Sequence, residues 1–419
     1  MTSTLLSEED VAILELEGPT VAGHTCKVIG LERTVSVEQV RARVERRIAA
    51  APLLRTRLRD GDPPAWVKAP DFSVGRQVVP WSDEAIDEQE LAAVVAALFE
   101  QRLDRERPLW RIDVVELEGG AGALIWRLHH ALADGTTSMR LADALLWDEA
   151  RERVAAAAPR ARPARPAADQ ERRRGHLAGF LEREFAESIH RSPFDGEIGA
   201  RRQIAFATAP LAPLHDAAKA LASATVNDAV LCVVAGGLRR WVEHHHGKLG
   251  TMRFRVPVSL HSEGDDASNH DSFFTLPVHL DEPDPVVRLR SIHASGAERK
   301  GDRDADRRRR LLESLRSELP PLASLAERLE ASPRSFALCV SNVPGPRGRV
   351  SVCEAPVRSL HSIAEVGRGH GLRAAVVSLA GELHFGLCAD PAIADDLDEM
   401  AAGIEAEAAA LVESAQPVR

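Results

Sequence analysis

The spacing of apolar and polar residues predicts alternating helices and strands in the first part of the chain. Four apolar side chains recur every three or four positions between residues 37 and 51, so they share one face of a helix: Val37, Val40, Val44 and Ile48. Further apolar patterns predict a strand at 64–67, a helix at 88–101, and strands at 109–117 and 123–128. The pattern becomes helical again after Gly135.

The second part of the chain repeats this alternation. Thr225 and Asp228 have the spacing of a capping box, which predicts the start of an apolar helix that extends to His246. Other predicted helices cover 212–223 and 394–415, and predicted strands cover 254–260, 272–280, 335–340, 372–379 and 383–387. A charged face or loop is expected at 298–310. Two α/β halves joined by a crossover are the simplest arrangement of these elements.

Length and local composition predict where the halves meet. The chain has 419 residues, which exceeds what one ordinary core accommodates. Residues 154–174 are rich in Ala, Arg and Pro, which is typical of a solvated linker, although an Arg-rich stretch could also bind phosphates or lipid headgroups. We therefore expect an N-terminal domain at 1–153, a linker and crossover at 154–191, and a C-terminal domain at 192–419.

Composition and charge exclude several classes of protein. Hydrophobic residues make up 44% and charged residues 28%, which is typical of a soluble globular protein. The net charge of -10 argues against nucleic acid as a partner. The 5 cysteines are dispersed without a C-x-x-C pair, which disfavours a disulfide framework or a zinc site and favours a reducing compartment. We find neither a signal peptide nor an apolar stretch of ~20 residues, so we expect a cytoplasmic protein, at most peripheral to a membrane.

One segment carries candidate chemistry: residues 129–135, His-His-Ala-Leu-Ala-Asp-Gly, which we call the histidine motif. His130 follows an apolar strand and suits general base catalysis, because the ordinary pKa of imidazole lies near neutrality. Asp134 can brace the loop or cap the next helix, and Gly135 permits a backbone angle that a side chain would obstruct. We expect His129 to orient the loop. The alternative is a pair of structural histidines at a strand end, and the spacing alone does not decide between them.

A run of three histidines at 244–246 suggests a metal site at first sight. Adjacent residues on a helix point in different directions, so they make a poor chelate. We therefore predict no metal site and favour an interaction of these side chains with the C-terminal end of the helix dipole.

Several motifs in a fixed order resemble the bacterial wax ester synthase/acyl-CoA:diacylglycerol acyltransferase family. The resemblance extends from about Leu5 to the C-terminal helix. The matching segments besides the histidine motif are Arg107–Trp110 (RPLW), Ser192–Gly196 (SPFDG), Thr225–Leu231 (TVNDAVL), Val256–Leu260 (VPVSL), Ser341–Pro346 (SNVPGP) and Phe385–Asp390 (FGLCAD).

The resemblance implies a fold and a reaction. The expected α/β fold has two chloramphenicol-acetyltransferase-like domains, each a mixed β-sheet with flanking helices, and an active-site tunnel at their interface. An acyl group would pass from coenzyme A to an alcohol, either diacylglycerol or a long-chain alcohol. His130 would remove the hydroxyl proton and return it to the leaving thiolate, without a covalent acyl-enzyme, while Asp134 would shape the loop. No bound cofactor is implied, because acyl-CoA is a co-substrate.

The same resemblance suggests residues that bind substrate, each with a structural alternative. Asn227 and Asp228 would lie near the tunnel, but helix capping alone explains both residue types. Trp110 most simply packs beneath the site. Asn342 begins a loop whose prolines and glycine set backbone geometry.

Departures from the family pattern leave the substrates open. The chain has no tyrosine, Asp71-Phe72-Ser73-Val74 is not followed by histidine, and the usual G-N element appears as Ser268-Asn269. Alternatives to the lipid acyltransferase are a related enzyme acting on a specialised metabolite or a carrier-bound thioester, and a silent lipid-binding relative. Association with a membrane or lipid-droplet surface is a further possibility.

Overall fold

A computed structural model describes residues 4–149, 192–247, 250–259, 271–301 and 337–416 of the chain. The whole of the predicted linker at 154–191 therefore lies outside the described residues, and so does Ser268-Asn269. Of the charged segment predicted at 298–310, only the first part is described.

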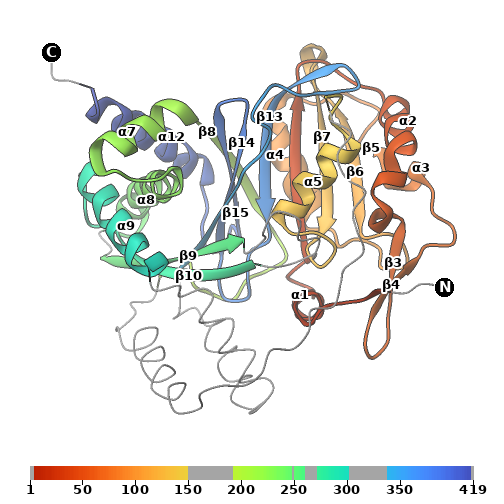
Figure 1. Cartoon of the computed structure of the whole chain (residues 1–419), viewed down its shortest axis with the longest axis horizontal. Helices are drawn as coiled ribbons and strands as arrows, with labels where there is room; N and C mark the ends of the chain where they lie inside the picture. Colours follow the sequence, from red (N-terminus) through yellow and green to blue (C-terminus); the bar gives the residue numbers. More distant parts are fainter. Residues whose placement is uncertain (1–3, 150–191, 248–249, 260–270, 302–336, 417–419) are drawn as a thin grey trace.

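Two mixed six-stranded sheets dominate the architecture and lie side by side in the molecule (Figure 1). In spatial order, the first sheet contains β12 (Ser351–Val352), β13 (Ala355–Ala364), β2 (His24–Leu31), β7 (Gly122–His129), β6 (Trp110–Glu116) and β5 (Val78–Pro80). The second contains β10 (Asp271–His279), β9 (Thr251–Ser259), β11 (Leu338–Val343), β14 (Leu372–Leu379), β15 (Glu382–Ala389) and β8 (Gln203–Pro210). A small sheet adds β1 (Thr4–Leu5), β4 (Ala65–Lys68) and β3 (Thr56–Arg59).

Helices cover the faces of both large sheets. Those of the first half are α1 (Glu8–Leu16), α2 (Val37–Arg47), α3 (Val74–Gln77), α4 (Leu91–Phe99) and α5 (Gly135–Leu145). Those of the second half are α7 (Leu211–Ala222), α8 (Val226–His245), α9 (Pro285–Gly301) and α12 (Leu397–Ser414). Short 3-10 turns occur at η1 (Ile48–Ala50), η2 (Pro52–Arg55), η3 (Glu88–Glu90) and η4 (Glu118–Gly120). The predicted mixed α/β class is confirmed.

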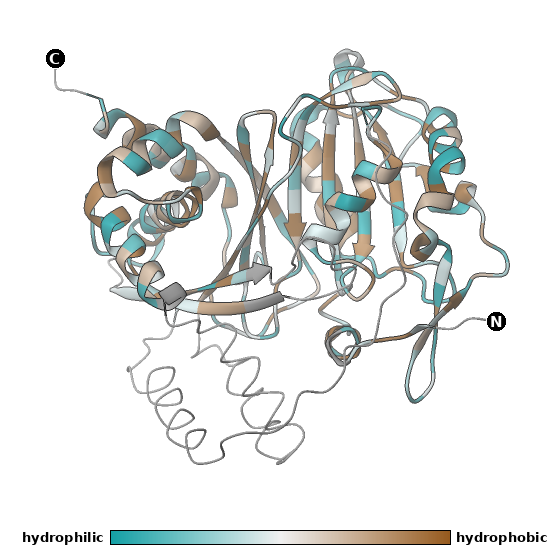
Figure 2. Cartoon of the chain, in the orientation of Figure 1, coloured by the Kyte–Doolittle hydropathy of each residue, from teal (hydrophilic) through white to brown (hydrophobic). Residues whose placement is uncertain are grey.

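The amphipathic patterns correspond to real helices. Val40 and Val44 of α2 are fully buried, as their spacing predicts. Figure 2 shows hydrophilic residues on the outer turns of α2 and apolar residues along the strands of the first sheet. Thr225 caps α8 through a reciprocal capping box with Asp228, which confirms the predicted helix start.

Some sequence-based boundaries were wrong. The strand predicted at 335–340 is β11, which continues to Val343 because its end pairs with β14. The segment around 298 is not a loop at its start, because α9 continues to Gly301. The strands β2, β8 and β13 were not predicted at all.

β13 changes the domain division. It comes from the C-terminal half of the chain but pairs antiparallel with β2 of the first sheet. All eight residues of β2 are buried, so this strand needs neighbours on both edges. The domain boundary predicted at residue 192 therefore does not separate the two sheets, because a strand from the second half of the chain completes the first sheet.

A third apolar cluster joins the halves. α4 packs on β2 and β8, and its Phe99 shares a buried cluster with Val28 and Ile125. Ile204 of β8 and Ile363 of β13 belong to the same cluster. The two sheets are thus held together by a shared buried core and not only by chain connectivity.

None of the described helices is by itself long and apolar enough to cross a bilayer. α7 and α8 together meet the requirement by length and composition, with a bend of 96° between them.

Candidate active site

Backbone hydrogen bonds at the end of β7 fix the position of His130. Its N–H donates a hydrogen bond to the carbonyl oxygen of Gly23 at 2.9 Å. The preceding N–H, from His129, donates to the carbonyl oxygen of Leu109 at 2.9 Å. His130 itself is half-buried, so its imidazole combines a fixed backbone with partial access.

Asp134 caps the helix that follows. Its side chain is fully buried and its Oδ1 accepts a hydrogen bond from the backbone N–H of Thr137 at 2.6 Å. Ser138 supports the same turn by donating from its hydroxyl to the carbonyl oxygen of Gly135 at 2.7 Å. The cap predicted from the sequence is confirmed, and it gives Asp134 a structural task beside the base.

The reason for a glycine at position 135 differs from the one we predicted. Gly135 is not one of the described glycines with a positive φ, so no unusual backbone angle requires a glycine here. A Cβ at this position would come within 2.8 Å of Cγ2 of Val343. Glycine is needed because β11 of the second sheet approaches the helix start closely.

His129 is buried and engaged on both ring nitrogens. Its Nδ1 accepts a hydrogen bond from the N–H of Ala131 at 3.1 Å, so its Nε2 carries the proton that faces Glu17 Oε2 at 3.2 Å. Glu17 also pairs with Arg105 at 2.7 Å. Burial would raise the pKa of Glu17, but the hydrogen bonds from His129 and Arg105 outweigh it and the pKa is lowered. These contacts support the predicted orienting role of His129.

The surroundings of His130 favour its neutral form. Burial, together with the positive charge of Arg373, lowers the pKa of His130 to about 4, and Asp134 only partly opposes this. A group with that pKa is unprotonated at neutral pH, so its ring can accept a proton.

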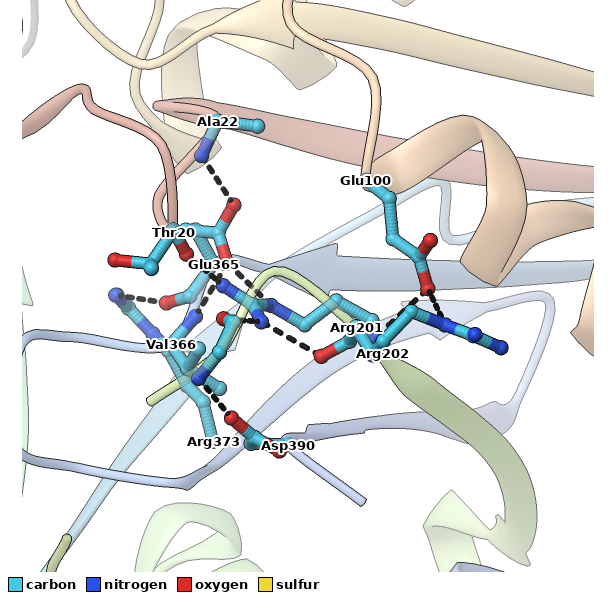
Figure 3. A network of polar contacts seen from close by, with 10 residues as sticks. Thr20, Ala22, Glu100, Arg201, Arg202, Glu365, Val366, Arg373 and Asp390 are labelled. Carbon is cyan, nitrogen blue, oxygen red and sulfur yellow. Dashed lines mark hydrogen bonds and ion pairs between the residues drawn. The ribbon is translucent and has the colours of Figure 1, made fainter. Parts of the chain in front are cut away.

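Arg373 belongs to a polar network that crosses between the halves (Figure 3). Its Nη1 donates to the backbone oxygen of Glu365 at 3.1 Å. The Glu365 carboxylate accepts from Arg202 Nε at 2.9 Å and from the backbone N–H of Ala22 at 3.1 Å. Burial raises the pKa of Glu365, and the charge of Arg202 opposes that rise. Since Ala22 precedes Gly23, the network reaches the carbonyl that holds His130.

A buried lysine lies on β2, near the histidine motif. Lys27 Nζ donates to Ser362 Oγ of β13 at 2.6 Å. Burial lowers its pKa to about 8, although the charges of Cys26 and Asp134 raise it. Lys27 therefore adds a second cation to the region that faces Asp134.

Trp110 and Asn342 both lie in strands, Trp110 in β6 and Asn342 in β11. Trp110 is buried, and its indole Nε1 donates to the carbonyl oxygen of Leu54 at 2.8 Å, as a residue packed beneath the site would. Asn342 of β11 pairs with Val376 of β14, so it does not begin a loop as the sequence suggested. The turn after β11 is held by the N–H of Gly345, which donates to Ser378 Oγ at 3.1 Å.

Asn227 and Asp228 occupy the first turn of α8. Asp228 Oδ2 lies 2.9 Å from Nδ1 of His293 in α9, in addition to its capping contacts. The two faces of β11 point to different cores. Val340 packs in the core that contains α8, and Val343 packs on the core of the first half. The predicted tunnel between this turn and the histidine motif stays a prediction.

The sequence analysis missed Glu17, Lys27, Arg202, Glu365 and Arg373. At least 112 residues separate Glu17 from its partner His129, so no local pattern links them. The available signal was a charge inside an apolar strand: HTCKVIGL for Lys27 and LRAAVVSL for Arg373. A buried charge of this kind requires a partner, and this need could have identified both residues.

Family models match both halves of the chain. Residues 6–186 match the wax ester synthase/diacylglycerol acyltransferase catalytic domain. Residues 267–411 match the C-terminal domain of the same proteins.

Curated relatives and solved structures agree with these matches. A probable diacylglycerol O-acyltransferase of Mycobacterium tuberculosis, tgs2, is 30% identical over 362 residues, covering 76% of each chain. Another from the same species, tgs1, is 27% identical over 394 residues, covering 86% of this chain and 83% of the relative.

The solved structures support the fold. The wax ester synthase/diacylglycerol acyltransferase of Marinobacter aquaeolei VT8 superposes with a TM-score of 0.72 at 21% identity, covering 98% of this chain and 99% of that one. A starter condensation domain of rhizomide synthetase, in complex with C8-CoA, superposes with a TM-score of 0.62 at 14% identity, covering 97% and 95%. The two-domain chloramphenicol-acetyltransferase-like fold that the sequence predicted is thus confirmed.

Proposed function

The chain belongs to the wax ester synthase/diacylglycerol acyltransferase family. We propose that it transfers a fatty acyl group to an alcohol. The protein is an acyltransferase. The proposed donor is a fatty acyl-CoA, and the proposed acceptor is the free hydroxyl of diacylglycerol or of a long-chain alcohol. Relatives named as diacylglycerol O-acyltransferases support the first acceptor. The condensation domain in complex with C8-CoA supports a coenzyme A thioester as donor for this fold.

The proposed mechanism assigns the base to His130. Its neutral imidazole takes the proton of the acceptor hydroxyl while the oxygen attacks the thioester carbonyl carbon. The tetrahedral intermediate then expels coenzyme A thiolate, and the imidazolium returns the proton to the sulfur. The C–O bond forms, the C–S bond breaks, and no covalent acyl-enzyme occurs. General base catalysis of this kind contributes ~10²–10⁴-fold to the rate.

The observation that carries this proposal is the difference between the two histidines. His129 is buried, with one ring nitrogen bonded to Ala131 and the other to Glu17. His130 is half-buried and its pKa is lowered to about 4. Only His130 combines access with a neutral ring, and this combination supports its assignment as base.

The surrounding charges fit the reaction. Arg373 is close enough to His130 to lower its pKa, and a cation at that place also stabilises the oxyanion of the tetrahedral intermediate. Asp134 holds the helix start and does not need to touch substrate.

The proposal extends to four residues that would line or support the substrate site. Asn227 is half-buried at the first turn of α8, and Asn342 is half-buried near the end of β11, so both amides are accessible to a bound chain. Asp228 is buried and occupied by Thr225 and His293, which favours support of Asn227 over direct contact. Trp110 is buried and contributes to the floor of the site. We keep a cytoplasmic location, peripheral to membranes or lipid droplets, as a prediction.

Substrate choice is tested with the full-length protein and a matrix of acyl donors and alcohols. Release of free thiol gives the rate, and mass spectrometry identifies the ester. We expect turnover with long-chain acyl-CoA and with diacylglycerol or hexadecanol. Turnover with acyl-carrier protein but not with acyl-CoA would favour the carrier-dependent alternative. No ester from any donor would favour the silent lipid-binding relative.

A further inference from the structure

Two helices of the second half bring three potential metal ligands together. His244 and His245 end α8, and Glu399 lies in the first turn of α12. Nδ1 of His244 is 2.9 Å from Glu399 Oε1, and Nε2 of His245 is 2.9 Å from Glu399 Oε2. The ligand atoms of the three side chains lie within 4.8 Å of one another.

We propose that His244, His245 and Glu399 bind a divalent transition-metal ion, with Zn²⁺ as the representative. Two imidazoles and one carboxylate form a donor set that suits this class of ion. Bond lengths of about 2.0–2.2 Å would hold neighbouring ligand atoms roughly 3.3–3.5 Å apart in a tetrahedron. The two histidine–carboxylate distances of 2.9 Å are shorter than this, and the whole set lies within 4.8 Å, so side-chain rotations would be needed to enclose the ion.

The ring of His245 is oriented by its neighbours. Trp241 stacks on it with ring centroids 4.4 Å apart and an interplanar angle of 19°. Trp241 is itself anchored, because its Nε1 donates to the backbone oxygen of Asp395 at 2.9 Å. The Asp395 carboxylate lies 3.9 Å from Nδ1 of His245, on the side opposite Glu399. At that distance the carboxylate makes no hydrogen bond, but its charge favours a proton on Nδ1, which leaves Nε2 as the ligand that faces Glu399.

One of the three proposed ligands lies far from the histidines in the sequence, which explains why the sequence analysis predicted no metal site. The sequence analysis predicted no metal site from three adjacent histidines, and His246 indeed lies apart from the proposed ligands: it is the C-cap residue of α8 and packs against Trp241 at 5.3 Å. The third ligand is instead Glu399, 155 residues from His244. It is delivered by the packing of α12 on α8.

This packing gives the ion a structural task. α8 and α12 approach so closely that a Cβ on Gly237 would lie 2.9 Å from the backbone of both Met400 and Ile404. An ion at the end of α8 would tie it to the start of α12. Three protein ligands leave one position of a tetrahedral ion for water, and His244 is exposed, so exchange with solvent ions is expected.

The competing explanation is a plain ion pair between the histidines and Glu399, aided by the helix dipole. Calorimetry with chelator-treated full-length protein and Zn²⁺ distinguishes the two. We expect one-to-one binding and a higher melting temperature in Zn²⁺. Glu399→Gln keeps the size of the side chain and removes its charge, and it should weaken binding at least tenfold. His245→Ala should do the same.

The matched control is His246→Ala, which removes a neighbouring histidine that faces Trp241 and should bind Zn²⁺ like the unchanged chain. Circular dichroism checks that each variant is folded, and the visible spectrum of bound Co²⁺ reports tetrahedral coordination. Absence of binding by the unchanged chain would overturn the proposal. So would binding that Glu399→Gln leaves intact, since it would reveal only adventitious contact with exposed histidines.

Discussion

The carboxylate of Glu365 accepts a hydrogen bond from the backbone N–H of Ala22 at 3.1 Å, although 343 residues separate them in the chain. Ala22 precedes Gly23, whose carbonyl oxygen receives the N–H of His130. The second half of the chain therefore helps to hold the backbone of the proposed base. The same glutamate pairs with the buried guanidinium of Arg202 at 2.9 Å.

Removal of this carboxylate should destabilise the fold and slow catalysis. Glu365→Ala removes the ion-pair partner of the buried Arg202, so we expect a loss of about 3–5 kcal/mol in the free energy of unfolding. Urea denaturation measures this loss. Arg201→Ala is the matched control, because its exposed ion pair with Glu100 is expected to contribute only about 0–1 kcal/mol. Equal effects of the two substitutions would contradict a special role for Glu365.

Asp134 should act through the helix cap. Asp134→Ala removes the acceptor of the Thr137 N–H, and we expect about 0.5–2 kcal/mol of destabilisation together with a lower kcat. Asp134→Asn keeps an acceptor oxygen, so it should retain most of the stability and much of the activity. Chemical denaturation and steady-state rates on both variants check this. Full stability of Asp134→Ala would argue against the cap.

Gly135 and Val343 should be coupled through space. Gly135→Ala places a methyl group 2.8 Å from Cγ2 of Val343, and overpacking of this kind costs about 1–3 kcal/mol. Val343→Ala removes the obstructing methyl groups, so the double variant should recover much of that loss. A double-mutant cycle measures the coupling. Simple additivity of the two substitutions would show that this contact does not limit position 135.

Arg373 should set the acid limb of the pH profile. Its positive charge disfavours protonation of His130, whose pKa is lowered to about 4. The base is therefore unprotonated from neutral pH down to that value, and kcat/KM should fall only as the pH approaches 4. Arg373→Gln removes the charge, so the pKa of His130 should rise and the acid limb should move to higher pH. An unchanged limb in this variant would separate Arg373 from the base.

Local chemistry made much of the fold predictable. The valine spacing of α2, the capping box of Thr225 and Asp228 and the cap by Asp134 all depend on residues a few positions apart. β2 and β13 escaped prediction, since strand pairing across more than 300 residues leaves no local signal. Both strands are also buried over most of their length and do not alternate between apolar and polar residues.

The site followed the same division. The histidine motif could be predicted from the sequence because the end of a strand, a loop and the start of a helix lie together in one short segment. Glu17, Glu365 and Arg373 were not, because each reaches the motif from a distant part of the sequence. Gly135 was identified for the wrong reason, since the close approach of Val343 is visible only when both sheets are in place.

His130 is proposed as the general base. A single-turnover measurement with His130→Ala and His129→Ala tests this assignment. Acyl-CoA and acceptor are mixed with excess folded protein, and ester formation is followed by rapid quench. We predict that His130→Ala slows the chemical step by ~10²–10⁴-fold while acyl-CoA binding is retained. His129→Ala should lose stability as well as rate, because Glu17 and the backbone N–H of Ala131 would each lose the hydrogen bond that they make with His129. An undiminished single-turnover rate in His130→Ala would contradict the account.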